Sequence, residues 1–233
     1  MIRRGAILAA YGKILPIELL SIPAHGFLNI HPSLLPQYRG SSPVVGALLS
    51  GDTETGVSLI CLDAKMDHGP IIAQEKTQIL PTEHRSELEL RLAKLGGKLV
   101  TQSLLPYLDG TLQPIAQIHA DATYTKLLNN TDARLDWTNS ATVIDRRVRA
   151  LDPWPGTKTI FQGQPLKILA GRPATENIAH SPAGTVINYK SQPAVVCGEG
   201  VYLLEKIQVA SGKPTNAVDF CRGHRDFIGS HLD

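Results

Sequence analysis

Two polar side chains with catalytic potential lie two residues apart in a short strand-like segment. Residues 27–31 alternate in character as a β-strand does. Because successive strand side chains point to opposite faces, Asn29 and His31 share one face. A carboxamide N–H and an imidazole suit an oxygen that becomes negative while a carbonyl is attacked. The residues alone also allow a satisfied buried histidine beside an asparagine of a turn.

The polar pair is followed at once by a rigid loop. Pro32 cannot continue a paired ladder and Pro36 stiffens the residues after it, so the pair is predicted to stand at a strand end, where active sites are commonly built. Ser33 belongs to the same loop. It is not predicted to be an acyl-enzyme nucleophile, because the Gly-x-Ser-x-Gly turn of such serines is absent.

A carboxylate in the next polar loop completes the candidate site. Residues 56–62 form an apolar run of strand length, typical of a strand buried on both faces, and residues 63–70 form the loop after it. If this strand runs parallel to strand 27–31, its loop brings Asp67 to the polar pair. A carboxylate beside a histidine can hold it protonated or take up a proton. The alternative is that Asp67 is a turn or cap residue.

Three motifs in this order resemble a known family. They read Asn-Ile-His-Pro-Ser-Leu-Leu-Pro-x-Tyr-Arg-Gly, then Gly-Asp-x-Glu-Thr-Gly-Val-Ser, then Met-Asp-His-Gly-Pro. Together they resemble the 10-formyltetrahydrofolate-dependent formyltransferases, and within these the members that act on methionyl-tRNA. The order and spacing of all three motifs make the resemblance more specific than any single short pattern.

The resemblance implies roles for named residues. The catalytic trio falls on Asn29, His31 and Asp67. The segments implied to bind 10-formyltetrahydrofolate are Ser33, Leu34, Leu35 and Pro36, and, around the pterin, Gly12, Lys13, Ile14 and Leu15. The residues implied to contact tRNA are Arg39, Arg134, Arg146, Arg147 and Arg149. The alternative is that at least half of these arginines form ordinary surface ion pairs.

The composition is that of an ordinary globular protein of 233 residues with a formal net charge of +2. The three cysteines, Cys61, Cys197 and Cys221, have no paired or metal-like spacing, so we expect a reduced, cytoplasmic protein. No segment suits a membrane span or a signal peptide. No ligand cluster indicates a metal, and we expect a monomer.

The fold class expected is α/β, with an incomplete Rossmann-like formyltransferase domain followed by a small OB-like β-barrel. The catalytic domain is assigned to residues 1–109, a linker to 110–128 and a tRNA-binding domain to 129–233. From residue 129 onward, 12 Lys plus Arg oppose 10 Asp plus Glu, too small an excess to indicate nucleic acid by itself.

Periodicity predicts the main elements of both domains. In the first they are a buried parallel strand over 6–11, helices over 43–49 and 83–108 and a strand over 71–80; in the second, a helix from Thr138 or Ser140 to Leu151, strands over 159–161, 166–169, 184–187, 194–197 and 201–204, and a closing helix near 217–220. The resemblance implies roughly another third of a chain before residue 6, as family members carry. The sheet is therefore expected to lack its first β-α-β units.

The mechanism expected is direct transfer without a covalent enzyme intermediate. The α-amine of methionine on initiator tRNA attacks the formyl carbon of 10-formyltetrahydrofolate. Asn29 and a protonated His31 stabilise the oxyanion. Asp67, through a water, keeps His31 charged and helps move the proton to the leaving nitrogen.

Two other functions compete with this one. A sugar-amine formyltransferase would keep the same trio, and an inactive fragment would at most bind tRNA through the second domain. A purine-pathway formyltransferase is disfavoured, because it normally lacks a second domain.

Overall fold

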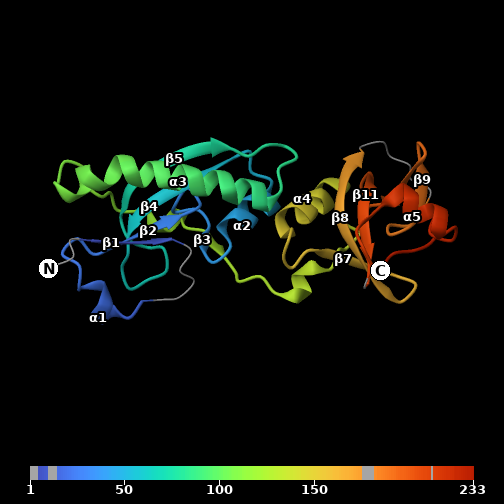
Figure 1. Cartoon of the computed structure of the whole chain (residues 1–233), viewed down its shortest axis with the longest axis horizontal. Coiled ribbons are helices and arrows are strands. Elements are labelled where there is room, and N and C mark those ends of the chain that lie inside the picture. The colour runs from blue at the N-terminus through green and yellow to red at the C-terminus, as the bar shows by residue number, and fades with distance from the viewer. Residues whose placement is uncertain (1–4, 10–14, 175–180, 211) are drawn as a thin grey trace. The chain divides into compact units, whose positions relative to one another are not determined.

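The computed structural model describes residues 5–9, 15–174, 181–210 and 212–233. They form two compact units, Met1–Leu127 and Leu128–Asp233. Each unit has its own sheet, drawn in blue to green for the first and in orange to red for the second (Figure 1). The α/β fold class predicted from the sequence is confirmed.

The first unit is built on a four-stranded sheet. Its order is β1 (Ala6–Ala9), β2 (Phe27–His31), β4 (Glu54–Cys61) and β5 (Ile71–Gln78). Strand β1 runs parallel to β2, whereas β4 runs antiparallel to both β2 and β5. The parallel direction expected for the strand before Asp67 is therefore wrong. An apolar run indicates that both faces of a strand are covered, and it does not define the strand's direction.

Strand β1 differs from its prediction as a fully buried strand. In the described part of the sheet it is the edge strand, pairs with β2 and exposes Ile7. The short helix α1 (Ile17–Leu20) follows it.

A long helix packs on this sheet, and a second helix packs against the long one. Helix α3 (Arg85–Leu108) covers β2, β4 and β5 as a long green rod (Figure 1), and it buries Leu88, Leu92 and Leu99 as its spacing predicts. At Gly96 the helix comes so close to β2 that an added Cβ would lie 2.7 Å from Ile30 Cγ2. Ile30 thus faces α3, and Asn29 and His31 face away from it. Helix α2 (Pro43–Ser50) packs against α3.

Residues 110–125, which we call the strap, pack on the first unit. The strap contains a 3₁₀ turn, η1 (His119–Asp121), and the short strand β6 (Tyr124–Thr125), which pairs in parallel with β3 (Arg39–Gly40). Earlier in the strap, Ile115 forms an isolated β-bridge to Ile71 of β5 with two backbone hydrogen bonds of 2.8 Å. The segment predicted as a linker is thus largely a structural part of the first unit.

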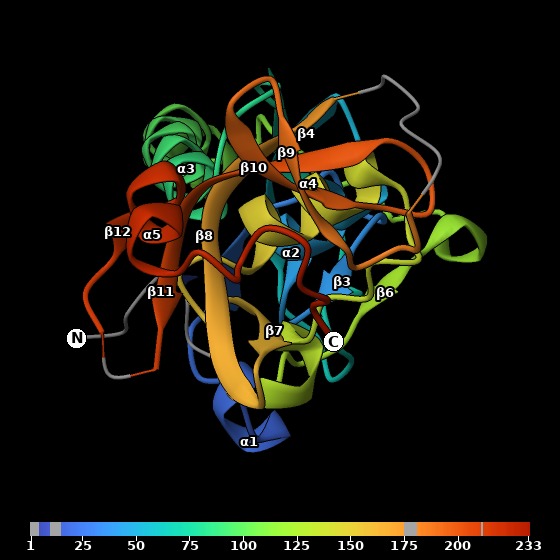
Figure 2. The same cartoon turned by 90° about the vertical axis from the view of Figure 1, so that its right-hand side faces the viewer.

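The described part of the second unit contains one sheet, two helices and a 3₁₀ turn. The helical elements are η2 (Asn130–Ala133), α4 (Ala141–Leu151) and α5 (Ala217–Gly223); the sheet has the order β7 (Thr157–Phe161), β8 (Gln164–Ala174), β11 (Val201–Val209), β10 (Gln192–Val196) and β9 (Val186–Tyr189), with β12 (Thr215–Asn216) on β11. Figure 2 looks onto these strands, with α5 beside β11. The Ser140 side chain caps α4 by accepting a hydrogen bond from Val143 N, as predicted.

The carboxyl-terminal residues connect the two edge strands of this sheet. Val186 N of β9 donates to Ser230 O at 2.9 Å, and Ile160 N of β7 donates to Asp233 O at 2.9 Å. The apolar core lies under these contacts and includes Phe227. The main chain is thus hydrogen-bonded from β7 through the other strands to β9 and on to the terminal residues.

Candidate active site

The structure brings the three predicted catalytic residues to one side of β2. His31 is 4% exposed, and its Nδ1 lies 3.5 Å from Oδ1 of Asp67. Asn29 shares the same strand face. The loop 62–70 carries Asp67 back over this face from the end of the antiparallel strand β4. Asp67 therefore lies beside His31 as predicted, but it follows an antiparallel strand and not a parallel one.

Asp67 is held on both its side chain and its backbone. Its Oδ2 accepts a hydrogen bond from Gly40 N at 2.8 Å, and its φ of +49° lies in the left-handed region that few residues other than glycine adopt. The neighbouring residue, Gly40, has φ +105°, and a Cβ there would lie 2.5 Å from Thr125 O. Only glycine fits beside the strap while its N–H reaches Asp67.

The contacts of His31 define its resting protonation. The ring Nε2 lies 3.0 Å from Tyr38 O, and because a carbonyl oxygen can only accept, we assign the proton to Nε2. Burial lowers the pKa of His31, and Asp67 and the Tyr38 carbonyl, which raise it, offset only part of this effect. The ring is therefore neutral at pH 7, with an unprotonated Nδ1 facing Asp67.

The lowered pKa favours a neutral resting His31 over the protonated one expected from the sequence. Loss of water around the buried ring outweighs the attraction of a carboxylate 3.5 Å away. A neutral His31 is suited to accept a proton, and Asp67 is placed to stabilise the imidazolium that forms.

Asn29 offers a hydrogen-bond donor to a ligand at this site. Its side chain is half-buried, and within the described ranges of the chain it makes no hydrogen bond. A carboxamide with free N–H groups beside a histidine fits the predicted oxyanion-binding role.

The loop predicted to bind folate is shaped by buried polar contacts. Ser33 is buried, and its hydroxyl donates to Gln37 O at 2.6 Å. Ser58 Oγ of β4 donates to Ser33 O at 2.7 Å and accepts from Leu35 N at 3.0 Å. Ser33 and Leu35 thus face the interior and shape the loop. Leu34 and Pro36 are half-buried, and an added Cβ at Gly56 of β4 would lie 2.5 Å from Leu34 Cδ2.

The predicted pterin segment is only partly described. Leu15 is half-buried ahead of α1, whereas Gly12, Lys13 and Ile14 lie outside the described residues.

The structure corrects the role expected for Arg39. Its side chain is 1% exposed, so it cannot present its charge to tRNA on the surface. Its Nη2 instead donates to Gln117 Oε1 at 2.6 Å. A one-letter pattern shows the charge of an arginine and not its burial. Gln117 was not among the predicted site residues, because no periodic pattern in its segment marks it as buried.

The four arginines of the second unit differ in exposure. Arg134 is exposed, and Arg146 is half-buried with a partner of its own. Arg147 Nη2 donates to Asp132 O at 2.5 Å, and Arg149 Nε donates to Asp145 Oδ2 at 2.7 Å within α4. Of the four, Arg134 is the one most available to a partner.

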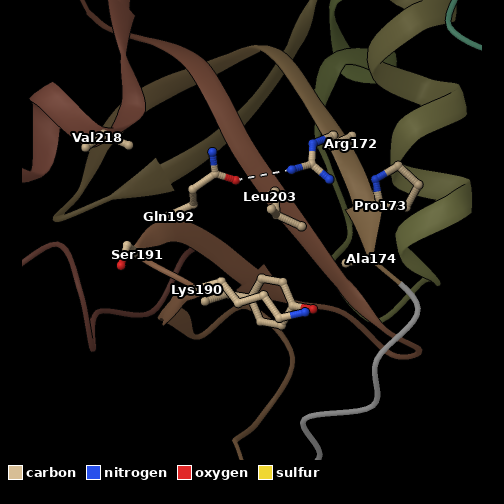
Figure 3. A pocket seen from close by; sticks show the side chains of 9 residues that line it. Arg172, Pro173, Ala174, Lys190, Ser191, Gln192, Leu203 and Val218 are labelled. Carbon is tan, nitrogen blue, oxygen red and sulfur yellow. Dashed lines mark hydrogen bonds between the residues drawn. The ribbon is translucent and has the colours of Figure 1, made fainter.

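A separate hollow lies on the sheet of the second unit. It measures about 810 Å³ and is lined in part by Arg172, Gln192 and Leu203, with Lys190 Nζ 5.1 Å from the centre of the Tyr189 ring (Figure 3). It contains none of the predicted site residues.

The described ranges hold neither a group of metal ligands nor a membrane-spanning helix. These residues contain no cluster of three or more His, Cys, Asp or Glu able to hold a metal ion. Within the same ranges, none of the helices has the length and hydropathy needed to cross a membrane.

The fold and the site define a formyltransferase. Residues 5–104 match the family described as formyl transferase, and residues 127–225 match the formyl transferase carboxyl-terminal domain. The chain belongs to the formyl transferase family, as the three sequence motifs indicated.

Curated relatives carry a more particular name. The chain is 46% identical to a methionyl-tRNA formyltransferase of Roseiflexus sp. (strain RS-1), an alignment that covers 97% of this chain and 70% of the relative. It is 44% identical to the methionyl-tRNA formyltransferase of Roseiflexus castenholzii, with 97% and 72% covered. The resemblance to the members that act on methionyl-tRNA is thereby confirmed.

A solved structure agrees at the level of the fold. HypX from Aquifex aeolicus, crystallised with tetrahydrofolic acid, superposes with a TM-score of 0.72 at 16% identity. The match covers 97% of this chain and 39% of HypX.

Proposed function

We propose that this chain transfers the formyl group of 10-formyltetrahydrofolate to the α-amine of methionyl-tRNA, giving the N-formylmethionyl-tRNA of translation initiation. One observation carries the proposal: Asn29, His31 and Asp67 lie together on one face of β2 in a chain that is 46% identical to a methionyl-tRNA formyltransferase. The fold, the family and the site chemistry all support a one-carbon transferase.

The first step is attack of the amine nitrogen on the formyl carbon. A new C–N bond forms, and the carbonyl oxygen takes up negative charge in the tetrahedral intermediate. The Asn29 N–H groups, free of other hydrogen bonds among the described residues, stabilise this oxygen. One such donor typically contributes about 2.7–4 kcal/mol to transition-state stabilisation.

The second step needs the proton of the attacking amine. Neutral His31 accepts it at Nδ1, because Nε2–H remains on Tyr38 O. The carboxylate of Asp67, 3.5 Å from Nδ1, stabilises the imidazolium. The bond from the formyl carbon to N10 of the folate then breaks, and the same proton neutralises the leaving nitrogen. Formylated amine and tetrahydrofolate are the products.

The folate is placed against the loop after β2 in this proposal. Leu34 and Pro36 offer half-buried apolar surface, while Ser33 and Leu35 fix the loop from the inside. A flat pterin and its linker suit such a surface of apolar side chains and backbone polar groups. Leu15 and the segment Gly12–Ile14 remain predicted pterin contacts.

The tRNA, the compartment and the assembly state belong to the same proposal. Arg134 is the first candidate for a phosphate contact, since it is exposed.

The three cysteines are free, in keeping with a cytoplasmic enzyme. We propose that the enzyme acts as a monomer, which light scattering at working concentration tests directly.

The acceptor is tested by competition. Labelled 10-formyltetrahydrofolate is given with methionyl-tRNA, with methionyl-tRNA whose amine is acetylated, or with an amino-sugar nucleotide. Label on methionyl-tRNA alone is the expected result. Label on the amino sugar alone would assign the chain to the sugar-amine class, and no transfer to any acceptor would contradict the proposed activity.

A further inference from the structure

Gln117 is buried, although it is polar and its apolar neighbours in the strap are exposed. Its polar side chain is 6% exposed, whereas the apolar side chains of Ile115 and Ile118 are exposed to solvent. Burial of apolar surface would favour the opposite arrangement. Specific polar contacts must therefore hold Gln117 inside.

The carboxamide of Gln117 uses its full hydrogen-bonding capacity. Its Oε1 accepts from Arg39 Nε at 3.2 Å and from Nη2 at 2.6 Å. Its Nε2 donates to Asp67 O at 2.8 Å and to Gly69 O at 2.7 Å. Two acceptor sites and two donors are thus all occupied. The reversed amide would point donors at the guanidinium, so the orientation is fixed.

Arg39 is a buried cation whose partners are neutral. Besides Gln117, it contacts Tyr124 Oη at 3.2 Å and His119 Nδ1 at 2.9 Å. Among the described residues, no carboxylate pairs with it. A buried charge without a counter-ion is costly, and a plain packing role would be served by an apolar residue. The guanidinium instead orients the Gln117 amide.

The contacts of Gln117 end on the catalytic loop. Gln117 Nε2 donates to the carbonyls of Asp67 and Gly69, two residues apart in the loop. Asp67 itself has a φ of +49°. The segment that carries Arg39 also contacts both reacting side chains, because Tyr38 O binds His31 and Gly40 N binds Asp67. The strap and this segment together fix the catalytic pair.

We propose that Gln117 is a positioning residue for catalysis: held by Arg39, its amide fixes the backbone of Asp67 and so the separation of the Asp67 carboxylate from His31. This inference rests on the proposed function, in which His31 and Asp67 move the proton. Gln117 itself touches no reacting atom.

The variant Gln117→Glu separates the contact of Gln117 with Arg39 from its contacts with the catalytic loop. A carboxylate keeps the size of the side chain and gives Arg39 a charged acceptor, but it removes both N–H donors to the loop. The fold should be retained, and kcat should fall about 10- to 100-fold, as for other supporting contacts of a site, with little change in KM. Gln113→Glu is the matched control, because it places the same charge on an exposed glutamine of the strap.

A double-mutant cycle with Asp67→Asn tests the mechanism. If Gln117 acts through Asp67, then Gln117→Glu should lower kcat in the parent and change it less than about threefold in the Asp67→Asn background. An equal loss in both backgrounds would overturn the inference. So would a parent-like kcat for Gln117→Glu.

A second variant and a substrate-free readout complete the test. Gln117→Met adds no charge, and the acid limb of its kcat/KM profile should move to lower pH, because Asp67 is the described charged group that raises the His31 pKa. Faster hydrogen exchange of the Gly40 amide is expected in both variants, since its acceptor is Asp67 Oδ2. Parent-like exchange would overturn the inference, as would loss of the whole fold in both variants. The exchange result stands even if the parent formylates another amine.

Discussion

The two units of this chain bury different kinds of side chain. In the first unit, the buried residues include polar and charged side chains around the site: His31, Ser33, Arg39, Ser58 and Gln117. In the second unit, the core cluster is aromatic and aliphatic, and its buried polar side chains among the described residues are Thr157 and Thr159. Buried polar networks specify one arrangement of groups, while apolar cores mainly supply stability.

This contrast assigns the proposed reaction to the first unit and a mainly stabilising core to the second. The first unit holds the left-handed Asp67, whose Oδ2 accepts a hydrogen bond from Gly40 N, at the place where the reaction is proposed. The second unit presents regular strands and an exposed Arg134. A substitution in the second core should therefore affect stability, and one beside β2 should affect rate.

The largest effect on stability is expected for Phe227→Ala. Phe227 is fully buried and packs edge-on against Phe161 and Phe220, with ring centres 5.0 and 5.1 Å apart. The variant should lower the free energy of unfolding by about 3–5 kcal/mol. Fluorescence during urea unfolding measures this in the second unit, because both tryptophans, Trp137 and Trp154, lie there.

The adjacent, more exposed Ile228 supplies the control for this prediction. Ile228→Ala should shift the unfolding midpoint far less. Equal shifts in the two variants would contradict the assignment of stability to the apolar core.

Asn29→Ala should affect rate and leave stability nearly unchanged. Loss of an oxyanion donor typically lowers kcat about 10²–10³-fold. The melting temperature should hold, because the Asn29 side chain makes no hydrogen bond within the described residues. The exposed Asn188 of the second unit provides Asn188→Ala as control. A kcat within threefold of the parent would remove Asn29 from the mechanism.

The pH dependence should report the buried His31. Its pKa is lowered in the folded protein, so between that value and its ordinary value of 6.5 the unfolded chain binds the proton and the folded chain does not. The free energy of unfolding should therefore fall as pH decreases through this window, by about 1.4 kcal/mol for each pKa unit of difference. The dependence should flatten in His31→Gln, as followed by urea unfolding at several pH values.

The catalytic rate should follow the same titration. Because neutral His31 accepts the proton, kcat/KM should fall as pH drops below the lowered pKa. A limb above the ordinary value of 6.5 would instead indicate a charged resting histidine.

The smallest effect is expected for Arg134→Ala. If this exposed side chain contacts a phosphate, its loss should weaken tRNA binding and reduce the slope of log Kd against log salt concentration by about one. Arg222→Ala is the control, because Arg222 is exposed and pairs with Asp219 at 2.6 Å. Identical salt slopes for the parent and Arg134→Ala would remove Arg134 from the tRNA surface.

Sequence patterns predicted the elements and the reacting groups better than their surroundings. The period of two placed Asn29 and His31 on one face, and helical spacing predicted α3 and α4. These patterns show which faces of an element are buried, and this information was sufficient to predict the elements. The patterns do not show strand direction, so the antiparallel direction of β4 was not predicted.

Three further points depended on tertiary contacts. Arg39 reads as a surface charge until its burial is known, and Gln117 lies in a segment without periodicity. The lowered pKa of His31 results from its desolvation, which a sequence does not show. Each of these is a property of how distant segments pack, namely loop 37–40, loop 62–70 and the strap.

The most direct test of the central claim is the single-turnover rate of formyl transfer from 10-formyltetrahydrofolate to methionyl-tRNA, measured in the parent and in His31→Ala. Saturating both substrates removes binding from the comparison. The account predicts transfer by the parent and a loss of about 10²–10⁴-fold in the variant, the usual contribution of a positioned acid or base. Parent-like transfer by His31→Ala would contradict it.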